Sequence, residues 1–215
     1  MTTEINKGPA FSLFSAPITN KYPSAEVHLK DIFDYITSDQ ATDATETLRA
    51  IADKTLARAY KSTHFSYTTF SGIFRSRADR EPILHSGLIC IDFDHLPCPE
   101  ATRTRLLEDI YFETQLLFTS PSGDGLKWII PIDITTASHT DYFRAISNYV
   151  RQTYGIEADK SGKDISRACF LPHDPNTYLN PKYLWQYEQK DIQSPGMAPA
   201  CAKLWRSRSV KNSIR

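Results

Sequence analysis

Two aspartates at the end of an apolar run are the residues of this chain best suited to chemistry. Residues 88–91 are apolar and predict a buried strand, and Asp92 and Asp94 follow with one phenylalanine between them. Residues two apart in a strand point to the same face, so both carboxylates are expected on one side. Adjacent carboxylates repel each other unless a cation lies between them, and Mg²⁺ or Mn²⁺ is the usual oxygen-bound choice. The alternative is that these aspartates only end the strand and begin a turn.

A second candidate lies in residues 116–132, where two apolar segments flank a turn rich in small residues. The segments predict a hairpin, and Gly123 and Gly125 allow positive φ and a close backbone approach. The N–H groups of such a loop can converge on an anion, with Lys127 beside it as a charge for phosphate. The spacing is not that of a P-loop, and a plain hairpin in which Asp124 serves the turn is the alternative.

A third candidate segment begins at Asp159 and continues through Asp164 to Arg167, which leads into another apolar strand. Both aspartates are candidate acids, and Asp-Lys-Ser-Gly is equally good turn chemistry. A simple ion pair with Asp164 is one interpretation of Arg167. His95 and His173 are interpreted as solvated or hydrogen-bonded side chains rather than as metal ligands.

Basic and aromatic residues are interleaved in residues 61–80, just before the acidic strand. Arg75, Arg77 and Arg80 in this setting suit a nucleic-acid backbone with stacked bases, and a solvated loop is the alternative. The whole chain has 25 basic and 25 acidic residues, so its net charge of zero does not indicate a nucleic-acid partner. The prediction of nucleic-acid binding therefore depends on local clusters of basic residues.

The composition is typical of a globular protein, with 215 residues, 40% of them hydrophobic and 23% charged. The four cysteines form no C-x-x-C pair or zinc-type spacing, which favours reduced thiols. No apolar run approaches the length of a membrane span, and the first residues do not have the order of a signal peptide. We therefore expect a cytoplasmic protein without a membrane segment.

The hydrophobic periodicity predicts an α/β (α+β) fold, with a mixed, mostly antiparallel sheet that carries the acids and helices packed behind it. The predicted helices span residues 27–36, 43–60, 100–113 and 138–153, the last between a Ser138 cap and Gly155. Further predicted strands are an edge strand at 11–16, a broken strand at 69–74, one at 168–171 and a last one through Tyr183, Trp185 and Tyr187. Residues 1–190 are expected to form one domain, followed by a basic tail or linker at 191–215.

The three motifs, taken in this order, resemble the catalytic core of archaeo-eukaryotic-type primases and primase-polymerases. Within that superfamily, residues 86–94, 119–127 and 164–175 look like the VirE N-terminal-type domain of Bacteroidetes proteins, which often precedes a helicase-like region. The resemblance covers residues 60–185, and its specificity comes from the combination of motifs.

The resemblance implies specific roles for these residues. Asp92 and Asp94 match the metal ligands of the first motif, and Asp159 best matches the third acid, with Asp164 as the competitor. The implied nucleotide contacts are Ser120, Ser122, Gly123, Gly125, Lys127 and Arg167. The family at large has histidine where this chain has Lys127, a flexible point charge that orients a triphosphate less sharply. This departure puts polymerisation in doubt more than nucleotide binding.

The function implied is that of a DNA primase or primase-polymerase, a nucleotidyltransferase active in replication of chromosomal or mobile elements. Its substrates would be a DNA template and nucleoside triphosphates, with a helicase domain or protein as a candidate partner. Bound Mg²⁺ or Mn²⁺ would activate a 3′-hydroxyl and stabilise the leaving pyrophosphate. Two alternatives remain: an inactive domain that binds single-stranded nucleic acid or recruits a helicase, and a metal-dependent nuclease.

Overall fold

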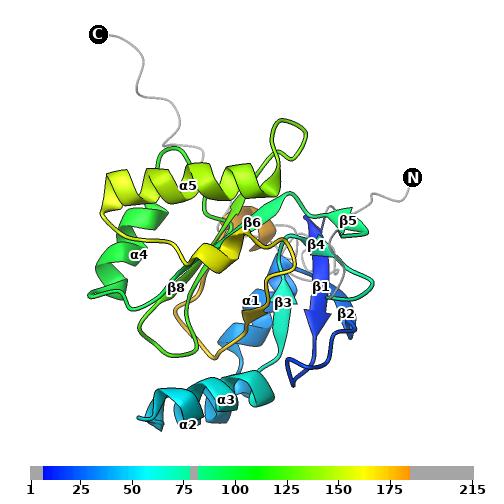
Figure 1. Ribbon diagram of the computed structural model, residues 1–215, viewed down its shortest axis with the longest axis vertical. Helices are drawn as coiled ribbons and strands as arrows, with labels where there is room; N and C mark the ends of the chain where they lie inside the picture. The colour runs from blue at the N-terminus through cyan, green and yellow to red at the C-terminus, as the bar shows by residue number, and fades with distance from the viewer. Residues whose placement is uncertain (1–6, 78–81, 185–215) are drawn as a thin grey trace, which may run out of the picture.

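The computed structural model describes residues 7–77 and 82–184 (Figure 1). Its strands are β1 (Ala10–Phe14), β2 (Ala25–His28), β3 (Tyr67–Thr69), β4 (Gly72–Ile73), β5 (Leu84–His85), β6 (Leu88–Phe93), β7 (Leu116–Thr119), β8 (Leu126–Pro131), β9 (Cys169–Phe170) and β10 (Tyr178–Leu179). Its helices are α1 (Leu29–Thr37), α2 (Thr42–Ala50), α3 (Lys54–His64), α4 (Pro99–Leu107) and α5 (His139–Tyr154), with 3-10 turns η1 (Asp39–Ala41) and η2 (Lys160–Lys163).

The strands form two four-stranded sheets, in the orders β2-β1-β3-β9 and β10-β7-β8-β6, and a small pair of β4 and β5. Neighbouring strands in each sheet run antiparallel. The predicted α+β class with antiparallel pairing is therefore confirmed, although the strands divide between sheets instead of forming one.

Two apolar cores cover the two faces of the β10-β7-β8-β6 sheet. One core lies between this sheet, the β1-containing sheet and α1, and it includes Phe11, Ile32 and Phe118. The other lies against α4 and α5 and includes Trp128 and Ile146. Figure 1 shows α4 and α5 on one side of β6 and β8, with α1 and the β1-containing sheet on the other. Each face of the sheet is buried, so a polar residue on either face requires a specific reason.

Helix α5 follows the prediction closely because its sequence contains both the apolar stripe and the end signals. Phe143, Ile146 and Val150 are buried along one face. The Ser138 side chain accepts from the backbone N–H of Asp141, and Gly155 ends the helix at φ 70°. These are the standard N-cap and left-handed C-cap arrangements.

Elsewhere the predicted boundaries required correction. The single helix expected over 43–60 is divided into α2 and α3, because the Asp53 side chain accepts from the N–H groups of Thr55 and Leu56 and begins a new helix. The first strand, predicted at an edge, is internal, since β1 pairs with both β2 and β3. The helix predicted over 27–36 begins instead at Leu29, because its first two residues belong to β2.

The predicted final strand is wrong within the described chain, because residues 181–184 are helical. Trp185, Tyr187 and the tail expected at 191–215 lie outside the described residues. Over residues 7–77 and 82–184, no helix has both the length and the apolar character needed to cross a membrane.

Candidate metal centre

The acidic site begins with the alternation of side chains along β6. Ile91 and Phe93 are fully buried in the core against α4 and α5. Leu88 and Cys90 alternate with them and belong to the core on the opposite face of the sheet. Asp92 and Asp94 follow on that opposite face, where they replace apolar side chains. Asp92 is only 7% exposed, whereas Asp94 is exposed. The predicted shared face of the two carboxylates follows from this two-residue period.

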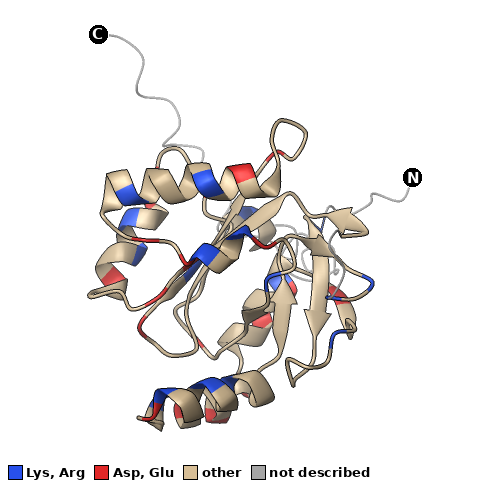
Figure 2. Ribbon diagram, in the orientation of Figure 1, with Lys and Arg blue, Asp and Glu red and all other residues tan. Residues whose placement is uncertain are grey.

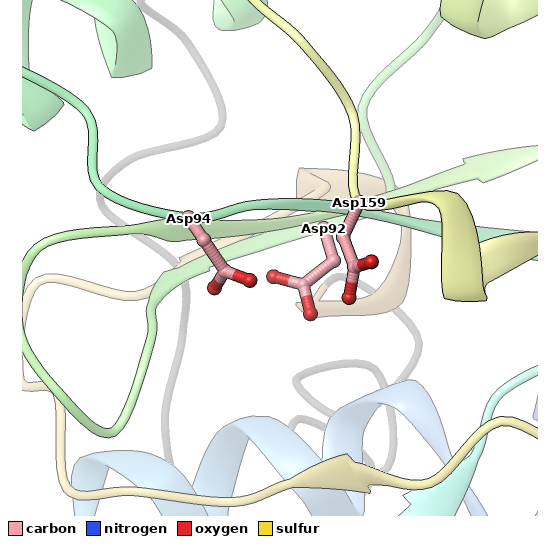
Figure 3. Close-up of side chains that lie close together, drawn as sticks. All are labelled: Asp92, Asp94 and Asp159. Atoms are coloured by element: carbon pink, nitrogen blue, oxygen red, sulfur yellow. The ribbon is translucent and has the colours of Figure 1, made fainter. Parts of the chain in front are cut away.

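Asp159 completes the acidic group from a distant part of the chain. Its backbone N–H donates to the Asp92 carbonyl at 2.8 Å, which attaches the segment after α5 to the open edge of β6. One carboxylate oxygen from each of Asp92, Asp94 and Asp159 lies within 4.8 Å of the others. Figure 3 shows the three carboxylates projecting from the same side of the chain. These three residues are the ones that the structure brings together.

Lys127 lies directly beside this group because β8 pairs with β6 in a register that sets Lys127 opposite Asp92. The Lys127 ammonium forms an ion pair with the Asp92 carboxylate, and both side chains are almost fully buried. Burial alone would lower the pKa of Lys127, but the attraction of Asp92 outweighs it and raises that pKa. Lys127 is therefore a fixed positive charge in the floor of the site.

The second carboxylate oxygen of Asp92 is buried and has no hydrogen-bond partner in the part of the chain that the structure describes. Burial raises the pKa of Asp92, and the negative charges of Asp94 and Asp159 raise it further against the opposing effect of Lys127. A buried, unpartnered carboxylate oxygen is costly unless something satisfies it. A divalent cation among the three carboxylates would do so, and an all-oxygen set suits Mg²⁺ or Mn²⁺. The residues present therefore fit a hard divalent cation.

Asp159 is held by a second set of partners. The hydroxyl of Ser161 donates to one carboxylate oxygen at 2.5 Å, and Arg167 donates to the same oxygen at 3.1 Å. Burial opposes the ionised form, but the Ser161 hydrogen bonds and the charges of Arg167 and Lys127 lower the pKa of Asp159 overall. Each of the two predicted phosphate cations thus contacts one acid of the cluster.

A comparison with protein families matches residues 59–179 to the family described as BT4734-like, N-terminal domain. The chain belongs to this family. Neither the curated proteins nor the solved structures gave a match. The BT4734-like segment contains the three acids, Lys127 and Arg167.

Within the BT4734-like segment, the structure separates the two candidates for the third acid. Asp159 joins the cluster, and Asp164 does not. Instead, the exposed Asp164 side chain accepts from the N–H and hydroxyl of Ser166 at 3.0 Å, a local turn arrangement. The alternative pairing of Arg167 with Asp164 is likewise replaced by the ion pair of Arg167 with Asp159.

The hairpin predicted at 116–132 is confirmed as β7 and β8, and its two glycines have different roles. Gly123 has φ 88°, whereas a side chain at Gly125 would place its Cβ 2.2 Å from the carbonyl oxygen of Phe93. The loop is closed by its own backbone. The Ser120 N–H donates to the Gly125 carbonyl at 2.8 Å, and the Gly123 N–H donates to the Ser120 carbonyl. The N–H groups of Ser120 and Gly123 are therefore not directed at an anion. Ser120 and Ser122 share a hydroxyl contact at 3.1 Å.

Three residues interpreted as structural have local partners. Asp124 accepts from the Ser122 hydroxyl at 2.7 Å and pairs with His95 at 2.5 Å. His173 is 2.8 Å from the backbone oxygen of Ser38. None of the three belongs to the acidic cluster found among the described residues.

The arginines before β6 have separate environments. Arg77 donates to the Tyr67 hydroxyl at 3.2 Å and to the Ile18 carbonyl at 3.3 Å, so its guanidinium links β3 to the loop after β1. Arg75 is exposed, and Arg80 lies outside the described residues. A role in nucleic-acid binding stays a prediction for all three.

Two cations near the site were not predicted. Arg49 of α2 donates to the Pro121 carbonyl at 3.2 Å and covers Gly123. Lys61, in the last turn of α3, interacts electrostatically with Asp92, Asp94, Lys127 and Arg167. The sequence signal for Lys61 was its position in the basic and aromatic segment 61–80, which carried no specific prediction for this residue.

Proposed function

We propose that this domain is a metal-dependent nucleotidyltransferase of the primase or primase-polymerase type, acting on a DNA template with nucleoside triphosphates. The observation that carries the proposal is the convergence of Asp92, Asp94 and Asp159 within 4.8 Å. Acids that converge from a strand and a distant loop are typical of a cation-binding site, because neighbouring carboxylates repel one another unless a cation lies among them.

The division of labour among the residues follows from their contacts. The three carboxylates would hold Mg²⁺ or Mn²⁺, which when bound supplies Lewis-acid activation of a 3′-hydroxyl and offsets charge on the leaving pyrophosphate. Lys127 and Arg167 lie against Asp92 and Asp159, so their charges are within reach of the same phosphates. Their role would be to stabilise the negative charge that develops on the triphosphate.

One observation favours a second candidate function, in which the domain binds single-stranded nucleic acid or recruits a helicase without catalysis. Lys127 already neutralises Asp92 through a buried ion pair. A lysine in this position competes with a divalent cation for the carboxylate. The balance between these two cations decides whether the cluster is a metal centre or a structural network.

A nucleotide-addition assay tests the proposal. The full chain is incubated with Mn²⁺ or Mg²⁺, labelled ribo- or deoxynucleoside triphosphates and single-stranded DNA, with and without a primer, and the products are separated on a gel. We expect primer extension or dinucleotide formation, reduced about a hundredfold or more in Asp92→Asn and Asp94→Asn.

Asp124→Asn is the matched control, because Asp124 is a nearby acid that is engaged with Ser122 and His95 outside the cluster. Its activity should remain within about twofold of the parent protein. Binding of single-stranded DNA with no product would overturn the proposal in favour of the second candidate. Shortening of the template would instead identify a nuclease.

A further inference from the structure

The face of β6 that carries the acids is opposed by the β2-β1-β3-β9 sheet, in which β9 is an edge strand. Cys90 precedes Asp92 by two residues and therefore shares its face. Its Sγ lies 3.9 Å from the Sγ of Cys169 in β9, so β9 lies over this face. The next residue along, Phe170, is covered by the Lys61 ammonium at 5.8 Å from its ring centroid. Lys61 thus approaches the site from the side opposite β6.

Lys61 differs from the other two cations of the site. Lys127 and Arg167 each form an ion pair with an acid of the cluster. Among the described residues, Lys61 has no ion-pair partner, and its contact is with an aromatic ring. Figure 2 shows basic residues along α3, and the sequence of this helix contains Lys54, Arg58 and Lys61 but no acidic residue.

The electrostatic surroundings of Lys61 contain both signs of charge. Burial lowers the pKa of Lys61 from its ordinary value of 10.5, and Lys127 and Arg167 lower it further against the attraction of Asp94 and Asp92. A half-buried ammonium that lacks a carboxylate partner has already lost part of its hydration. An arriving anion therefore gains more from this cation than from one fully in water.

We propose that Lys61 is a phosphate-binding residue of this site, contacting the triphosphate of a nucleotide held at Asp92, Asp94 and Asp159. The inference rests on the proposed function for its ligand class and adds α3 to the binding site. Lys61 would contact phosphates from the side opposite Lys127. The metal-bound polyphosphate would then lie between β6 and α3, with the acids on one side and the unpaired cation on the other.

Binding measurements on Lys61→Met test this inference. Titration calorimetry with the full chain and Mn²⁺ compares two probes, a nucleoside triphosphate and inorganic tripolyphosphate. We expect both to bind about tenfold more weakly to Lys61→Met, with partial recovery in Lys61→Arg. Lys54→Met is the control, since Lys54 is exposed at the opposite end of the same helix. Its affinities should match those of the parent protein.

The outcomes separate this inference from the proposed function. Equal affinities of Lys61→Met and the parent protein for both probes would overturn the role of Lys61 and leave nucleotidyl transfer intact. Lys61-dependent binding of tripolyphosphate, with no nucleotide addition in the gel assay, would support Lys61 and overturn the polymerase proposal. A parent protein that binds neither probe would overturn both.

Discussion

The backbone N–H of Asp159 donates to the carbonyl oxygen of Asp92 at 2.8 Å, and this bond determines which acids share the site. It continues the ladder of β6 beyond the edge of its sheet, so the loop after α5 occupies the position of a further strand. The Asp159 side chain consequently meets Asp92 and Asp94 from the adjacent backbone.

The first prediction concerns the third acid. Asp159→Asn should weaken Mn²⁺ binding about tenfold or more, because it removes a charged ligand from the cluster. Asp164→Asn should leave the affinity unchanged, since Asp164 serves a local turn. Calorimetric titration with Mn²⁺ measures both. Equal losses in the two variants would show that Asp164 also contributes to the site.

The second prediction concerns competition between Lys127 and the metal. Lys127→Met should lower stability without Mn²⁺ by about 3 kcal/mol, because Asp92 is left buried and unpaired. It should also increase the stabilisation given by Mn²⁺, since no ammonium then competes for the carboxylate. Thermal melts with and without Mn²⁺ report both effects. Lys163→Met, at an exposed residue of η2, is the control; a Mn²⁺ shift in Lys127→Met no larger than in the control contradicts the competition.

The third prediction concerns the close approach of the hairpin loop to β6. Gly125→Ala should destabilise the protein by about 3 kcal/mol or more, because the new Cβ would lie 2.2 Å from the backbone oxygen of Phe93. Gly155→Ala is the comparison because, apart from its chain neighbours, no atom of residues 7–77 or 82–184 lies within 4 Å of its added Cβ. The left-handed φ of 70° opposes this substitution by about 1 kcal/mol. Urea unfolding of the two variants should rank them in this order. The reverse order would mean that the loop can move away from β6.

The fourth prediction concerns a histidine pair beside η2. The His85 Nε2 lies 3.4 Å from the His139 Nδ1, and the His85 Nδ1 accepts from the Gly87 N–H. Burial and the neighbouring His85 lower the pKa of His139 to about 4, against the opposing effects of Gly162 and Asp164. Because this folded-state pKa lies below the unfolded value near 6.5, stability from neutral His139 is fully present above pH 6.5. It is lost progressively as the pH falls from 6.5 towards 4, by about 3 kcal/mol at most.

Urea unfolding at pH 7 and pH 5 tests the histidine prediction. The parent protein should lose more stability over this interval than His139→Gln, which cannot be protonated. His64→Gln, at an exposed residue of α3, should behave like the parent protein. A His139→Gln variant with the same pH dependence as the parent protein would remove His139 as the source of the effect.

The sequence alone determined the features that depend on local periodicity and turn chemistry. The Asp-x-Asp spacing after an apolar run required both carboxylates on one face of β6. The small-residue turn between two apolar segments specified the hairpin, and the Ser138 and Gly155 signals specified the ends of α5. Each feature is encoded within a few neighbouring residues.

Only the tertiary structure decided which distant groups meet these local features. Asp159 and Asp164 lie in similar turn sequences, and their separation depends on the segment that pairs with the edge of β6. The Lys127–Asp92 ion pair depends on the strand register, and the position of Lys61 depends on how β9 and α3 pack over the acidic face. Such contacts arise from burial and edge pairing between remote segments, for which a single sequence contains no periodic signal.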